Sequence, residues 1–88
     1  MKIVKKENGH STDSTEFKFD NGAWVSIYNG GDTRMGSWEF QADEEDGETY
    51  SEGGLWIDNN VVEDYDGCYE LPEEVRMALT DLGFTMED

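Results

Sequence analysis

The chain is poor in cysteine, histidine and proline. Its 88 residues include one cysteine, one proline and one histidine. The single cysteine, Cys68, excludes a disulfide within the chain and fits a reducing compartment such as the cytoplasm. The one histidine, His10, lies in a polar segment where no Ser-His-Asp or Cys-His arrangement is suggested. We therefore predict a protein that is not an enzyme and that holds no cofactor and no metal.

Long apolar segments and positive charge are also scarce. The apolar stretch near the amino terminus is only Ile3 and Val4, so no signal peptide is expected, and no segment reaches transmembrane length. Six lysines and arginines stand against 22 acidic residues, a net charge of −16. Such a chain repels nucleic acid and anionic membranes, so we expect neither as a direct partner. A basic protein surface is its natural complement.

The negative charge is concentrated in the second part of what we expect to be one domain, residues 1–88. Residues 1–34 carry five acids and five bases, whereas residues 35–88 carry the other seventeen acids and one base, Arg76. An even solubilising coat would not divide in this way. The division predicts a field that is strong on one side of the molecule.

Turn signals such as Asn21-Gly22 and Asp46-Gly47 separate short segments rich in aromatic and β-branched residues, which is the pattern of antiparallel hairpins. A three-residue loop ending at Gly22 would pair Phe19 with Ala23 and give one apolar face. The strands expected from this pattern are 2–6, 15–19, 23–28, 37–45 and 48–58.

The segment 37–58 is predicted to form a hairpin with an acidic face. A two-residue turn at Asp46-Gly47 sets Trp38 opposite Leu55 and Phe40 opposite Gly53, which places these residues on the core face. The opposite face then carries acids from both strands, namely Glu39, Asp43, Glu45, Glu48 and Glu52.

A change of period marks the end of the chain. Val75, Ala78, Leu79 and Leu82 form a helical stripe, which predicts a helix over 72–82 with Gly83 as its C-cap. Phe84 can then pack back on Leu79 in a Schellman arrangement. The expected fold is α+β: an antiparallel sheet of about four to five strands with one C-terminal helix packed on one face.

The acidic hairpin face has two interpretations. Its charges can simply keep a hairpin soluble and discourage edge aggregation. Alternatively, a rigid array of carboxylates imitates the phosphates of a duplex, and the exposed aromatic residues beside it provide packing against a basic protein. On the second interpretation the partner-binding residues are Glu39, Asp43, Glu45, Asp46, Glu48, Tyr50, Glu52, Trp56, Glu63, Asp64 and Asp66.

In its small size and in the acidic run 43–52, the chain resembles a broad class of phage and mobile-element proteins that mimic DNA. This class includes restriction inhibitors and anti-CRISPR proteins. The resemblance is one of type and transfers no site residue. It implies an inhibitor that binds the nucleic-acid-binding surface of a host defence nuclease or CRISPR-type complex in the host cytoplasm.

Three other functions stay open at this point. An immunity protein or antitoxin that neutralises a basic nuclease would use the same electrostatics. A structural phage or assembly protein would self-associate, and the sequence does not decide between a monomer and a homodimer. A calcium-binding module would use residues 63–73, but with Gly67 at position six of an EF-hand loop, position one falls on Val62, which has no ligating group.

Overall fold

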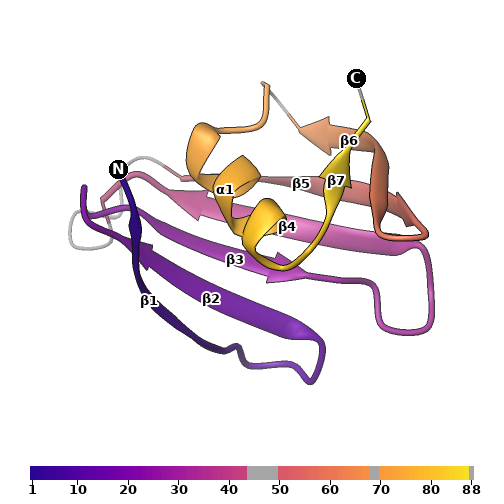
Figure 1. Ribbon diagram of the computed structural model, residues 1–88, viewed down its shortest axis with the longest axis horizontal. Coiled ribbons are helices and arrows are strands. Elements are labelled where there is room, and N and C mark those ends of the chain that lie inside the picture. Colours follow the sequence, from indigo (N-terminus) through magenta and orange to yellow (C-terminus); the bar gives the residue numbers. More distant parts are fainter. Residues whose placement is uncertain (44–49, 68–69, 88) are drawn as a thin grey trace.

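The computed structural model describes residues 1–43, 50–67 and 70–87. Across these ranges the chain forms a curved sheet of seven strands in sequence order and one short helix that packs on one of its faces (Figure 1). The elements are β1 (Ile3–Asn8), β2 (Ser14–Phe19), β3 (Trp24–Tyr28), β4 (Met35–Gln41), β5 (Tyr50–Asp58), β6 (Val61–Gly67), α1 (Glu73–Asp81) and β7 (Thr85–Met86). No helix in the described part of the chain is long and apolar enough to cross a membrane.

The expected antiparallel sheet of four to five strands is therefore wrong in size and in type. Within the described residues the sheet has seven strands and is mixed, because the last strand, β7, runs parallel to β6. The chain leaves the helix and returns beside β6, where the Thr85 N–H donates to the Asn60 carbonyl at 2.9 Å. Two strands after residue 60 were thus missed, and one of them carries part of the candidate site.

Strand β6 occupies a segment in which the sequence predicted no strand. Asn59 and Asn60 both have positive φ, of 52° and 65°, and they join Asp58 to its partner Val61 as a two-residue turn. Positive φ at both central residues defines the type I′ hairpin turn, which asparagine tolerates well. The Asn-Asn pair was the turn signal that the sequence offered for this strand.

A β-bulge hides the alternation of β6. Ile57 pairs with Val62, but the preceding Trp56 pairs with Asp64, so Glu63 is an extra residue on β6. The bulge places Val62 and Tyr65 toward the core although they are three residues apart. The sequence of β6 therefore lacks the strict alternation of apolar and polar residues by which a strand is recognised, and its most evident feature is its acidic residues.

The β2–β3 hairpin has the predicted register. Phe17 pairs with Val25, and the Phe19 N–H donates to the Ala23 carbonyl at 3.0 Å. Gly22 adopts φ +90°, the left-handed position that the three-residue loop requires. These paired residues are buried at 3% exposure or less, which gives the sheet its apolar face.

The β4–β5 register is shifted by two residues from the prediction. Trp38 pairs with Gly53, not with Leu55, and Glu39 pairs directly with Glu52. A shift of two preserves the faces, so Trp38 stays in the core, but it changes every cross-strand neighbour. The missing side chain of Gly53 thus leaves space for the indole of Trp38, whereas the predicted register placed Phe40 opposite Gly53. The predicted Asp46-Gly47 turn lies outside the described residues.

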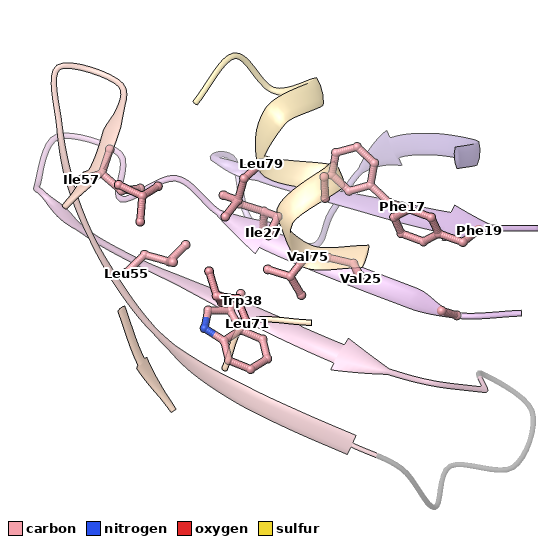
Figure 2. Close-up of a cluster of buried hydrophobic side chains, with 13 residues drawn as sticks. Phe17, Phe19, Val25, Ile27, Trp38, Leu55, Ile57, Leu71, Val75 and Leu79 are labelled. Atoms are coloured by element: carbon pink, nitrogen blue, oxygen red, sulfur yellow. The ribbon is translucent and has the colours of Figure 1, made fainter. Parts of the chain in front are cut away.

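The core lies between the sheet and α1. Val75, Ala78 and Leu79 of the helix are fully buried against the sheet, as the predicted stripe requires. Figure 2 shows Val75 and Leu79 of the helix together with Ile27 and Val25 of β3 in one cluster. The helix is one residue shorter at each end than predicted, since Pro72 is its N-cap. The buried cluster comprises Phe17, Phe19, Ala23, Val25, Ile27, Trp38, Leu55, Ile57, Val62, Leu71, Val75, Ala78 and Leu79.

The helix ends in a Schellman motif, as the sequence predicted. Gly83 adopts φ +95°, and its N–H donates to the Thr80 carbonyl at 3.0 Å. The Phe84 N–H donates to the Leu79 carbonyl, also at 3.0 Å. This cap turns the chain back toward the sheet, and β7 follows directly. The helix covers one face of the sheet and leaves the other face open to solvent (Figure 1).

Candidate functional site: the open face of the sheet

The open face of the sheet carries polar, acidic and aromatic side chains, and two lysines, Lys5 and Lys18, at its β1–β2 end. In a strand, successive residues point to opposite faces, so the neighbours of buried residues define this side. Glu16 alternates with Phe17, Glu39 with Trp38, and Glu52 is two residues from Gly54 on the same side of β5. We call this surface, opposite α1, the open face.

One row of the open face is acidic across almost the whole sheet. Reading the registers from β1 to β5, Glu7 pairs with Glu16, Glu16 with Ser26, Ser26 with Glu39, and Glu39 with Glu52. Since neighbouring strands are about 4.8 Å apart, this row spans about 19 Å and carries four carboxylates. We call these residues the glutamate row. It is assembled from five strands that are far apart in the sequence.

A trough runs beside the glutamate row because the middle of the next row holds two small residues, Ser37 and Gly54. There, Tyr28 pairs with Ser37, Ser37 with Gly54, and Gly54 with Asp66. Two hollows share Ser37 and Glu39 and follow this row. The one over β4 to β6 has a volume of about 620 Å³ and is lined by Ser37, Trp38, Glu39, Glu52, Gly53, Gly54 and Asp66.

The middle of the trough is electrostatically unfavourable in the free protein. Glu39 and Glu52 are directly opposed like charges, which destabilise a sheet. Ion pairs within the described residues lie elsewhere and join Lys5 to Glu7, Lys6 to Asp81 and Arg34 to Asp58. None of them neutralises Glu39, Glu52 or Asp66. A cation from outside can therefore relieve repulsion that the described part of the chain leaves in place.

Tyr50 holds one of these carboxylates in position. Its hydroxyl donates a hydrogen bond of 2.9 Å to Oε2 of Glu52. Desolvation of the hydroxyl raises the pKa of Tyr50 above its ordinary value of 10.0, and the hydrogen bond to Glu52 and the charge of Glu39 raise it further. The phenol thus remains a donor at any ordinary pH.

A spectrophotometric pH titration tests this arrangement. The difference between the wild type and Tyr50→Phe isolates the ionisation of Tyr50, whose midpoint we expect above pH 10. Because the fold favours the neutral phenol, its contribution to stability is complete below pH 10 and is lost as the pH rises beyond the raised pKa. Glu52→Gln should lower that midpoint by removing a negative charge. A midpoint at or below pH 10 would contradict the contact.

Aromatic and apolar side chains extend the trough beyond the acids. Trp56, Met35 and Asp64 form the next row, and Trp56 and Met35 are 41% and 67% exposed. A smaller hollow between them shares Gly54 and Asp66 with the acidic hollow. At the other end, the Trp24 indole Nε1–H donates to Glu16 Oε1 at 3.1 Å. Rings beside charges are typical of protein interfaces.

The structure brings six of the predicted partner-binding residues to the open face. The Asp43 side chain lies just past the end of β4, and Glu63 falls at the bulge of β6. Glu45, Asp46 and Glu48, which the sequence placed at the centre of the site, lie outside the described residues. The six residues on the open face are Glu39, Tyr50, Glu52, Trp56, Asp64 and Asp66.

Sequence reasoning missed the part of the site that comes from the first three strands. Glu7 of β1 and Glu16 of β2 belong to the glutamate row, and Ser26 of β3 lies between Glu16 and Glu39. The predicted β2–β3 register already placed Glu16 opposite Ser26. Linking these residues to Glu39 needs the β3–β4 register, which the loop after Tyr28 does not specify.

Residues 63–67 of the segment considered for calcium lie in strand β6, and α1 begins at Glu73. Asp64 and Asp66 pair with β5 and lie on the open face, so they do not belong to a ligand loop. Among the residues that the structure describes, no three His, Cys, Asp or Glu side chains are grouped to hold a metal ion. The geometry expected for an EF-hand loop is not present there.

Comparison with known proteins finds no matching family model, no similar curated protein and no similar solved structure. The open face must therefore be interpreted from its own chemistry.

Proposed function

We propose that the protein is an acidic inhibitor that occupies the basic nucleic-acid-binding surface of a host defence nuclease or CRISPR-type complex. The observation that supports it best is the glutamate row, in which four carboxylates cross five strands on the face opposite the helix. Duplex DNA carries one charge per about 3.4 Å along each strand. A line of four carboxylates over about 19 Å is less dense but of the same order.

Inhibition on this proposal is steric and electrostatic. The open face docks where nucleic acid would lie, and arginines and lysines of the partner exchange phosphate oxygens for the carboxylates of Glu39, Glu52 and Asp66. Trp56 adds packing area beside them. Because the sheet is already formed, little ordering is needed on association. The cytoplasm, where such enzymes act, is the proposed location.

Displacement by DNA tests the proposal. The protein is immobilised and partners are captured from bacterial lysate at low salt, and a DNA duplex is then added. We expect the captured proteins to be nucleic-acid-binding proteins. The duplex should release them because it competes for the same basic surface, and raised salt should release them because it screens the charges. Capture that survives both treatments would refute mimicry.

A variant that changes Glu16, Glu39, Glu52 and Asp66 to their amides is the matched control. It should capture none of these partners. If it captures them equally well, the open face is not the binding surface. An immunity protein or antitoxin would give the same results in the displacement experiment and with the amide variant. The identity of the captured protein, a toxin nuclease or a defence complex, separates the two functions.

A further inference from the structure

Gly54 is a glycine that the isolated fold does not require. It lies in the middle of β5 with ordinary strand backbone, since the glycines with positive φ in the described residues are Gly22, Gly30, Gly31 and Gly83. A Cβ added at Gly54 meets no atom within 4 Å. Glycine inside a strand weakens it and often marks a place where a ligand or another chain approaches closely. The open space at Gly54 therefore points outward, to a binding partner.

The surroundings of Gly54 combine two chemistries. The acidic hollow, with Glu39, Glu52 and Asp66, and the apolar hollow, with Met35 and Trp56, meet at Gly54. Directly opposed residues on neighbouring strands have Cβ atoms about 5 Å apart, so the Glu39 and Glu52 carboxylates can reach one group between them. A complementary ligand has a planar cation and an apolar stem.

We propose that the hollow at Gly54 accepts an arginine side chain of the partner protein, an assignment that rests on the proposed function. The guanidinium lies over Gly54 and donates to Glu39 and Glu52, and Asp66 adds a third carboxylate. Its stem packs against Met35 and the ring of Trp56. Charge complementarity favours a basic partner. Among the basic side chains of that partner, an aromatic ring beside two carboxylates favours arginine over lysine.

Arginine fits this hollow better than lysine for geometric reasons. Guanidinium is a planar fork with five donors that can bridge two carboxylates and stack on an aromatic face at the same time. An ammonium group is a strongly hydrated point charge without a planar face. The Tyr50 hydrogen bond to Glu52 fixes one of the carboxylates and so favours the directional ligand.

Two capped hexapeptides, one with four arginines and one with four lysines, test the assignment by NMR titration of the full chain at low salt. The arginine peptide should bind roughly fivefold tighter and shift the Gly54 amide and the Trp56 indole N–H signals. Gly54→Ala should abolish this preference while the lysine affinity holds and the melting temperature does not fall. Trp56→Ala, which removes an exposed ring, should do the same.

Each outcome has a distinct meaning. Equal affinity of the two peptides for the wild type, or an arginine preference that survives both variants, overturns the arginine assignment and leaves the proposed function standing. If neither peptide binds even at low salt, the open face has no affinity for basic segments, and the proposed function fails with it. Arginine preference that both variants abolish supports the assignment.

Discussion

Exchange of Glu39 and Glu52 for glutamine is expected to weaken binding to a basic partner by about a hundredfold. Two charge-assisted contacts are lost, and each contributes about 1.5 kcal/mol at the lower end of the usual range. The same change should raise the free energy of unfolding by about 0.5 kcal/mol, because it removes directly opposed like charges. Glutamine keeps an oxygen that accepts the Tyr50 hydroxyl, so the local geometry is retained.

If the double variant is more stable than the wild type but binds less, its loss of binding cannot be due to misfolding. Glu73→Gln with Glu74→Gln is the matched control, because it removes the same charge from the first turn of α1, on the other side of the sheet. It should bind normally and lose a little stability, since these acids complement the helix dipole. Urea unfolding and peptide titration at two salt concentrations measure both effects. A double variant that binds as wild type would exclude the Glu39–Glu52 pair from the site.

The second large effect is expected at the neighbouring glycine. Gly53→Ala would place a methyl group 1.7 Å from the Asp66 carbonyl oxygen and 2.7 Å from Nε1 of Trp38. The backbone of β6 cannot yield without breaking its pairing with β5, so we expect a loss of about 3 kcal/mol, at the upper end for overpacking. For a domain of this size that lowers the melting temperature by roughly 12–24 °C.

Gly54→Ala is the natural control, since the two glycines are adjacent on the same strand. Its methyl group meets open space, and alanine forms strands better than glycine by about 0.5–1 kcal/mol. Thermal unfolding of both variants should therefore shift in opposite directions. Similar losses of stability for Gly53→Ala and Gly54→Ala would show that the packing of β4, β5 and β6 differs from that described. The space above Gly54 would then not be open to a partner side chain.

Local chemistry was enough to predict the parts of the fold that depend on near neighbours in the sequence. The three-residue loop needs a left-handed residue, which Gly22 provides, and this predicted the β2–β3 register. Gly83 likewise ends the helix in the expected Schellman motif. Alternation placed Glu39 and Glu52 on the face away from the core, and a register shift of two could not change that.

The strands after β3 were predicted poorly. The bulge at Glu63 breaks the period of β6, and a strand of two residues such as β7 has no periodic signal at all. The pairing of β4 with β5 followed a turn predicted at Asp46-Gly47, and the described register is two residues away from it. In each case the packing of the folded protein, more than the local sequence pattern, decided the pairing.

By itself the sequence determined the net charge, the absence of an internal disulfide and the division of strand residues between a core side and a polar side. Only the tertiary structure decided which acids stand together. Glu7, Glu16, Glu39 and Glu52 come into one row because four consecutive registers align them, and a shift of two residues in any one of them would break the row. Alternation fixes a face, but register fixes a neighbour, and the candidate site is made of neighbours.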